Sequence, residues 1–301
     1  MVKKLVLLVV GIMMAALFAG CGNDAPKEQA SKKIQVVTSF NAMAEFTKAI
    51  GGDKVEVSTI IPDGVEPHDF ELKPENMKQL ATAQVFVYNG FGMEPWAKQA
   101  IEAAKNDKLV TVVATEGVEA IKNTDPEEIK EHGAEDPHAW LSLKDAKIEV
   151  KNIKDALVKA DPANKDYYEK NYTEYVGKLD TMIKKYEEQF AKAPHKNFVT
   201  GHAAFAYLSR DFGLEQNSVE DVFAEGEPNA AQLAKLIEYV KENNIKTIFA
   251  EEMASPEVSK TLAKEVGAKV ETIYTIESKE DDKTYLQRMD ENLAKILESL
   301  K

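Results

Sequence analysis

The longest helical pattern in the chain spans residues 161–194, with the sequence DPANKDYYEKNYTEYVGKLDTMIKKYEEQFAKAP. Its apolar residues recur at spacings of three and four, which places them on one face of a helix: Tyr168, Tyr172, Tyr175, Leu179, Met182, Tyr186 and Phe190. Asp161 is expected to be the N-cap, with Pro162 behind it. Roughly 30 residues would give a helix about 45 Å long, more than one lobe requires. The pattern therefore predicts one long rigid helix over residues 161–193 that joins two lobes; a pair of helices broken near Gly177 is the alternative.

Short β-branched segments alternate with amphipathic segments on both sides of this helix, which indicates βαβ units and mostly parallel sheets. The expected strands are residues 34–37, 55–61, 85–88 and 109–113 before it, and 198–200, 245–250 and 270–274 after it. The expected helices are residues 41–50, one that begins at Pro74, and residues 203–211, 229–243 and 256–266. The predicted fold class is α/β with two lobes, each a mostly parallel sheet flanked by helices. We expect the N-terminal lobe over residues 34–160 and the C-terminal lobe over residues 194–301.

The first residues have the features of an export signal. Lys3 and Lys4 precede an uncharged run over residues 5–18. As a helix this run would extend about 21 Å, which is short of the roughly 30 Å needed to cross a bilayer. Residues 1–20 are therefore expected to be a signal peptide.

The run ends at Ala19-Gly20-Cys21, which contains the only cysteine of the chain. Two small residues before a cysteine are typical of a bacterial lipoprotein signal, in which the thiol becomes acylated. We expect Cys21 to be the lipidation site, residues 21–33 to be a flexible linker, and the protein to be extracytoplasmic and anchored to the cell membrane by lipid. The alternative is an unmodified thiol near a transmembrane helix.

The chain is strongly acidic. Its formal net charge is −13, and removal of residues 1–20 takes away two lysines and no acids, so the mature part carries −13 − 2 = −15. Such a surface makes nucleic acid an unsuitable partner. The segment 123–136 holds six acids without an apolar stripe and is expected to be a mobile loop. We expect the protein to be a monomer.

Three of the five histidines lie in short segments where a loop meets an α/β element. They are His68 in Pro67-His68-Asp69, His138 in Asp136-Pro137-His138, and His202 in Gly201-His202-Ala203. Ligands of α/β proteins gather beyond the carboxyl ends of parallel strands, and His68 and His202 both follow expected strands. Glu277 follows the last expected strand and is the candidate carboxylate. Three imidazoles and one carboxylate match the ligand set that Zn²⁺ prefers, so the sequence predicts a metal site.

The other two histidines have different surroundings. His132 lies in the acidic segment and is expected to be a solvent-exposed residue or a weak ion collector. His195 follows Pro194 at the end of the long helix, where a cation favours the helix dipole. Neither is expected to bind the ion.

Several segments resemble the metal-binding signatures of the zinc and manganese solute-binding lipoproteins of ABC transporters. They are GVEPHDF (64–70), DPHAWL (136–141) and FVTGHAAF (198–205), with support from NGFGMEPW (89–96), EGEP (225–228) and FAEE (249–252). The resemblance covers nearly the whole chain in order. It implies two α/β lobes joined by one long rigid helix, with the ion in the cleft between them.

The resemblance also implies which residues bind the ion. The ligands fall on His68, His138, His202 and an acid in the last loop. We assign the acid to Glu277, because zinc-type members place Glu-Ser or Glu-Gly just after this strand; Glu280, Asp281 and Asp282 are the alternatives nearby. The third ligand is usually Glu in manganese-type members and His in zinc-type members. His202 therefore indicates Zn²⁺, with Mn²⁺ as the second possibility.

These features predict a binding protein rather than an enzyme. The expected function is to capture Zn²⁺ outside the cell and deliver it to an ABC permease that is driven by a separate ATPase subunit, because the chain has no phosphate-binding loop. A manganese-binding component is the alternative, followed by a secreted zinc hydrolase. The hydrolase is disfavoured by the fourth ligand and by the absence of His-Glu-x-x-His and Gly-x-Ser-x-Gly from the sequence.

Overall fold

The computed structural model describes residues 33–123, 129–130, 133–222, 224, 229–251 and 256–301. Seven expected features lie wholly or partly outside these residues: the signal peptide 1–20, Cys21, the linker 21–33, His132, the middle of the acidic segment, and the segments 225–228 and 249–252 that support the resemblance. Among the described residues, no helix combines the length and the apolar character needed to cross a membrane.

The first sheet contains four parallel strands in the order β2-β1-β3-β4. Their bounds are β1 Ile34–Thr38, β2 Val55–Thr59, β3 Val85–Tyr88 and β4 Val110–Val113. The register pairs Ile34 with Val55 and Val85 with Val110. The central strands β1 and β3 are rich in buried valine, as expected for a parallel sheet that is covered on both faces.

The second sheet repeats this topology with four parallel strands in the order β6-β5-β7-β8. Their bounds are β5 Asn197–Thr200, β6 Glu215–Ser218, β7 Thr247–Glu251 and β8 Lys269–Ile273. In both sheets the strand order reverses direction beside the first strand, where loops diverge and ligands of open α/β sheets bind.

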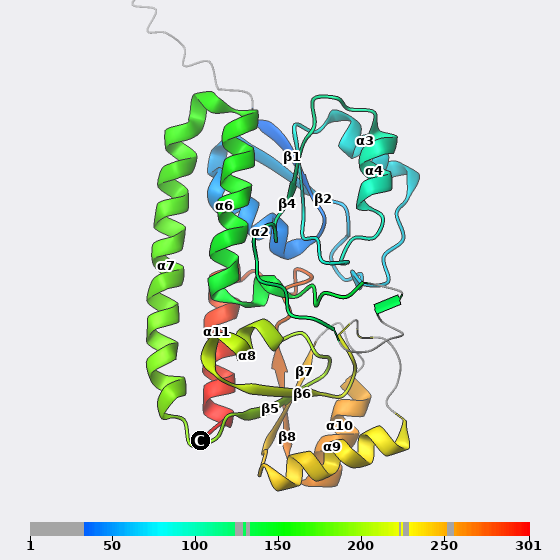
Figure 1. Cartoon of the computed structure of the whole chain (residues 1–301), viewed down its shortest axis with the longest axis vertical. Helices are drawn as coiled ribbons and strands as arrows, with labels where there is room; N and C mark the ends of the chain where they lie inside the picture. The colour runs from blue at the N-terminus through cyan, green and yellow to red at the C-terminus, as the bar shows by residue number, and fades with distance from the viewer. Residues whose placement is uncertain (1–32, 124–128, 131–132, 223, 225–228, 252–255) are drawn as a thin grey trace, which may run out of the picture. The chain divides into compact units, whose positions relative to one another are not determined.

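Helices cover both faces of each sheet (Figure 1). Those associated with the first sheet are α2 Asn41–Gly51, α3 Pro74–Thr82, α4 Ala97–Ala104 and α6 Leu143–Ala160. Those associated with the second are α8 Ala206–Phe212, α9 Ala230–Glu242, α10 Pro256–Val266 and α11 Tyr285–Ser299.

Adjacent side chains of one strand point to opposite faces. Val199 accordingly packs in the small core under α9 and α10, while Phe198 packs in the large core that also contains the first sheet.

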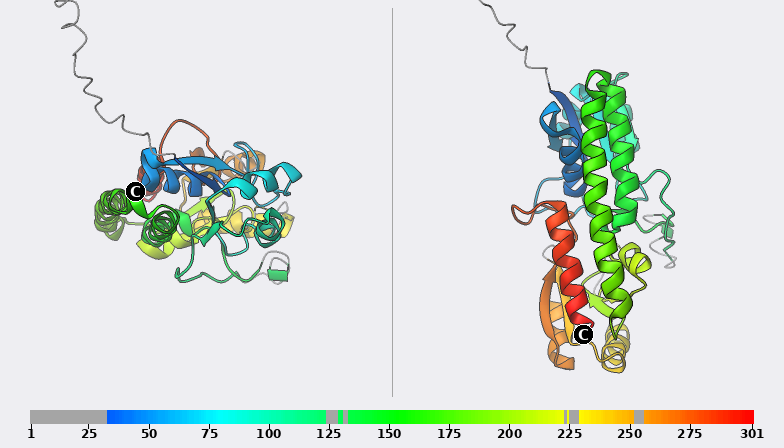
Figure 2. Two further views of the ribbon diagram at one scale, coloured as in Figure 1. Left: turned by 90° about the horizontal axis from the view of Figure 1, so that it is seen from above. Right: turned by 90° about the vertical axis from the view of Figure 1, so that its left-hand side faces the viewer.

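The long helix α7 Lys165–Lys192 is continuous and contacts helices of both lobes. Figure 2 shows it beside α6 along one part and beside α11 along another. Five residues of the predicted apolar face are buried, namely Tyr168, Tyr175, Leu179, Tyr186 and Phe190, whereas Tyr172 and Met182 are only partly buried; Ile183, which was not predicted, is buried as well. The two-lobed α/β fold with one connecting helix is therefore confirmed, and the alternative of a break at Gly177 is wrong.

The start of this helix differs from the expectation. Residues 162–164 form a 3-10 turn, and the α-helix begins at Lys165. Asp161 precedes the turn, but its carboxylate accepts hydrogen bonds from the Asn164 amide (2.6 Å) and the Tyr168 hydroxyl (2.8 Å) rather than from free backbone amides. The predicted helix over 203–211 also begins later, at Ala206, because the segment before it forms the loop that carries His202.

A substitution at Gly177 tests the continuity of α7. No atom outside the helix's own backbone and the neighbouring residues lies within 4 Å of a Cβ built there, so Gly177→Ala should stabilise the protein by about 0.5–1 kcal/mol. Denaturant unfolding gives the measurement. Gly213→Ala is the matched control, because Gly213 also has open space but a φ of 64°, and alanine there should cost about 1–2 kcal/mol. A Gly177→Ala variant less stable than the parent would argue against the continuous helix.

Candidate metal centre

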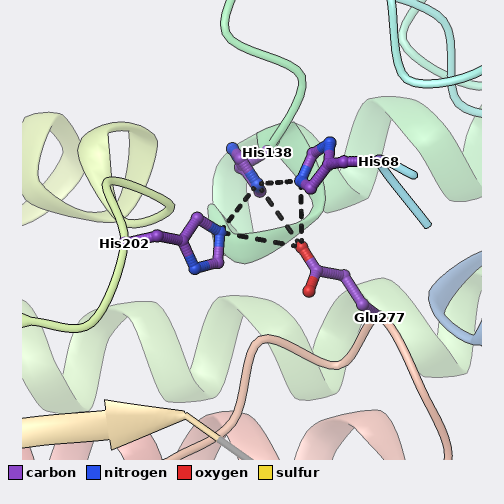
Figure 3. A group of neighbouring side chains, drawn as sticks. All are labelled: His68, His138, His202 and Glu277. Atoms are coloured by element: carbon purple, nitrogen blue, oxygen red, sulfur yellow. Dashed lines mark hydrogen bonds and ion pairs between the residues drawn. The ribbon is translucent and has the colours of Figure 1, made fainter. Parts of the chain in front are cut away.

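Four side chains from distant parts of the chain converge where loops of the two lobes meet (Figure 3). They are His68, His138, His202 and Glu277, and one donor atom of each lies within 4.8 Å of the others. The Nε2 atom of His138 is 3.3 Å from Nε2 of His68 and 3.2 Å from Nε2 of His202. Oε1 of Glu277 is 3.4, 3.6 and 3.9 Å from the Nε2 atoms of His138, His68 and His202. All four side chains are at most 3% exposed.

His138 is oriented by the acid two residues before it. Asp136 Oδ1 lies 2.9 Å from the Nδ1 atom of His138 and accepts a hydrogen bond from its backbone amide at the same distance. Pro137 between them offers its carbonyl to the Asn89 amide at 2.8 Å. Since Nδ1 is engaged by a carboxylate, Nε2 is left to face the other three groups.

His202 is oriented in the same way by a residue of another strand. Glu251, the last residue of β7, contacts Nδ1 of His202 through Oε2 and accepts from its backbone amide. The close approach needs Gly201, because a Cβ there would lie 3.1 Å from Oε2 of Glu251. Gln216 of β6 donates to the carbonyl of His202 at 3.0 Å, so three strands of the second sheet hold this loop.

Glu277 lies in the loop after β8, and one of its two carboxylate oxygens has a hydrogen-bond donor within the same loop. Oε2 accepts a hydrogen bond from the Thr275 hydroxyl at 2.8 Å, which leaves Oε1 directed at the imidazoles. His68 lies in the long loop after β2, and its backbone amide donates to Oε1 of Glu66 at 3.3 Å.

Burial and neighbouring charges shift the pKa values of these groups in different directions. Burial lowers the pKa of His68 to about 4, against the opposing pull of Glu277, so this imidazole is neutral. Burial would also lower the pKa of His202, but the charge of Glu251 outweighs it and raises that pKa to about 10. Burial acts to raise the pKa of Glu277, yet its contacts with His138 and His68 hold the pKa well below the usual range. The metal-free site therefore contains a carboxylate and an imidazolium.

Of the acids considered for the fourth position, the structure brings Glu277 into the group. Asp281 instead forms an ion pair with Arg288 at 3.0 Å, and Asp282 is exposed beside Lys279. His195 is exposed at the start of the second lobe, away from this group, as expected.

Two residues that serve the site received no role from the sequence alone. Asp136 and Glu251 both lie in segments that resemble the family, but only the structure shows that each contacts the Nδ1 atom of a histidine. For Asp136 the spacing to His138 was an available signal. For Glu251 none was available, because it lies 49 residues from His202.

Comparison with known proteins identifies the relatives of this chain. The model of the ZnuA family, zinc-uptake complex component A, periplasmic, matches residues 36–299. The high-affinity zinc uptake system protein ZnuA of Bacillus subtilis is 42% identical over 94% of each chain, and a putative metal-binding protein of Treponema pallidum is 41% identical over 88% of this chain and 86% of its own. The laminin-binding protein Lmb of Streptococcus agalactiae has a structure that superposes with a TM-score of 0.82, at 32% identity over 90% of this chain and 100% of that chain.

The two repeated sheets, the connecting helix and the site between the lobes define a solute-binding protein of the metal-ion type. Within that class, the chain belongs to the ZnuA family.

The pairing of His202 with Glu251 can be tested without metal. In the metal-free protein the His202 ring should remain protonated up to about pH 10, as followed by NMR of the histidine rings against pH. Glu251→Gln removes the opposing charge, so burial should then dominate and the ring should titrate several pH units lower. Asp136→Asn, which removes the partner of His138, is the control that should leave the high value of His202 largely in place. A His202 ring that titrates near pH 6.5 in the parent would contradict this account of the site.

Proposed function

We propose that this protein is the extracytoplasmic zinc-binding component of an ABC importer, and that His68, His138, His202 and Glu277 bind the transported Zn²⁺. The observation that carries the proposal is the convergence of three Nε2 atoms and one carboxylate oxygen in a buried group. The name of the Bacillus subtilis relative, a high-affinity zinc uptake system protein, supports it.

The spacing of the donor atoms fits a tetrahedral ion. Ligands about 2.0–2.1 Å from Zn²⁺ at the corners of a tetrahedron lie about 3.3–3.4 Å apart. Four of the separations in the site, 3.2, 3.3, 3.4 and 3.6 Å, are close to that value, and 3.9 Å is somewhat longer. The donor atoms of His68 and His202 lie within 4.8 Å of each other, so these rings and Glu277 would move closer together around the ion.

The chemistry of the donors favours Zn²⁺ over Mn²⁺. Once His202 loses its proton to bind the ion, three neutral imidazoles and one carboxylate form a nitrogen-rich set, whereas a harder ion such as Mn²⁺ suits more oxygen ligands. Asp136 and Glu251 add negative charge behind two of the imidazoles, which makes those nitrogens better donors.

The same arrangement supports transport rather than catalysis. A catalytic zinc ion keeps one position open for water or substrate, and here four protein ligands fill a tetrahedron. The ion is therefore cargo, to be handed to a membrane permease that works with a separate ATPase subunit. Nucleic acid has no part in this function, in keeping with the net charge of −13.

The location follows from the sequence of the N-terminus. We place a signal peptide at residues 1–20, a lipid on Cys21 and a flexible linker over residues 21–33, so that the monomeric binding protein is tethered to the outer face of the cell membrane. Cys21→Ala should abolish incorporation of labelled fatty acid into the protein in cells, and a parent protein whose N-terminal peptide carries no acyl group by mass spectrometry would refute the anchor.

The ligand assignment is tested by zinc titration of the purified soluble domain in competition with a chelator of known affinity. His68→Ala, His138→Ala and His202→Ala should each weaken Zn²⁺ binding by at least about 100-fold, because loss of a ligand costs no less than loss of the partner that orients it. Glu277→Gln keeps the size of the side chain and should weaken binding by at least about tenfold.

His195→Ala is the control, since this exposed histidine lies outside the site. Unchanged affinity in the His202→Ala variant would exclude the assignment. A metal-free parent that retains Mn²⁺ but not Zn²⁺ through gel filtration would overturn the choice of ion.

A further inference from the structure

The loop that carries Glu277 follows a strand of the C-terminal lobe, yet residues of the N-terminal lobe hold its backbone. The backbone amide of Asn41, the first residue of α2, donates to the carbonyl of Glu277 at 3.2 Å. The side-chain amide of Asn41 donates to the carbonyl of Ile276, also at 3.2 Å. One residue therefore binds two consecutive carbonyls of the loop, across a sequence separation of 235 residues.

Two further contacts from the same lobe support this loop. The indole Nε1 of Trp140 donates to the carbonyl of Thr275 at 2.8 Å, and the backbone amide of Gly64 donates to the Ser278 hydroxyl at 2.7 Å. Consecutive positions from Thr275 to Ser278 are thus fixed by the lobe that also carries His68 and His138.

The loop needs such support because its backbone is strained. Ile276 has a φ of 63°, in the left-handed region, where a β-branched residue is strongly disfavoured. Strain of this kind persists only where the surroundings dictate the conformation. Ile276 is fully buried, and the hydrogen bond from Asn41 to its carbonyl holds the peptide that follows it.

His202 is held differently. The partners of its loop named above, Glu251 and Gln216, both belong to strands of the second sheet. The loop of Glu277 is therefore held by the N-terminal lobe and that of His202 by the C-terminal lobe, although both follow strands of the same sheet.

We infer that Asn41 is a positioning residue for the fourth ligand: it fixes the Ile276–Glu277 peptide against the N-terminal lobe and thereby sets where the Glu277 carboxylate meets the ion. This inference rests on the proposed function. Without the Asn41 amide, the Ile276 carbonyl loses its buried donor and the strained turn can relax, which moves Glu277 away from the three imidazoles.

The test is a double-mutant cycle with Asn41→Ala and Glu277→Gln, read out as Zn²⁺ affinity and as the rate of Zn²⁺ loss to a chelator. Asn41→Ala should weaken binding about tenfold and speed Zn²⁺ loss, which is the size expected for a residue that orients a ligand. In the Glu277→Gln background the same substitution should change the affinity less than about threefold, because the group that it positions has already lost its charge.

Asn106→Ala is the matched control. Its side-chain amide also donates to two backbone carbonyls, those of Leu80 and Ala83 at 3.0 and 2.8 Å, but it does not touch the Glu277 loop. The Zn²⁺ affinity of the Asn106→Ala variant should equal that of the parent, even if its thermal midpoint of unfolding falls by as much as that of Asn41→Ala. If Asn41→Ala fails to fold, Ser278→Ala replaces it in the same cycle, because it removes the acceptor of the Gly64 amide from the same loop.

The outcomes separate the two proposals. Unaltered affinity in the Asn41→Ala variant, or an equal loss in both Glu277 backgrounds, overturns the positioning role and leaves the ligand set intact. Unaltered affinity in Glu277→Gln alone overturns the assignment of the fourth ligand itself.

Discussion

Four polar side chains buried together must balance their own charges, and the rest of the site is arranged around that requirement. An isolated carboxylate at the position of Glu277 would be costly to bury. It is stabilised by the imidazoles it faces and by the Thr275 hydroxyl, while Glu251 stabilises the protonated ring of His202. The group is thus preorganised for a cation, since its donor atoms already point at one another.

The fold supplies this arrangement by using one topology twice. In the first sheet the loops that follow β2 and β4 carry His68 and His138, and in the second sheet the loops that follow β5 and β8 carry His202 and Glu277. Helix α7 contacts helices of both lobes, and the large apolar core extends from the first sheet to one face of the second. A core shared in this way resists large hinge motion, because opening it would expose apolar surface.

Much of this fold could be predicted from the sequence, for reasons visible in particular segments. The β-branched composition of β1 and β3 predicted strands, and the spacing of three and four between apolar residues of α7 predicted a helix. The helix over residues 256–266 was predicted with its observed bounds. Strand β6, with the sequence EQNS, was missed because an edge strand can be polar and then lacks an alternating pattern. Helices α6 and α11 were also not identified, although their hydrophobic spacing was available.

The three histidines were found from their segments, whereas the choice of Glu277 needed the resemblance to a family. Asp281 was an equal candidate by spacing, and its pairing with Arg288 depends on where α11 packs. The contacts of Glu251 and Asn41 join residues 49 and 235 positions apart, so only the folded chain could reveal them.

The ion pair between His202 and Glu251 has a consequence for the exchange of cargo. While His202 keeps its proton, its imidazolium places a positive charge 3.9 Å from the Glu277 carboxylate, where the ion would otherwise supply one. Binding of the divalent ion then requires release of the His202 proton. A fall in pH therefore favours protonation of His202 and release of the ion.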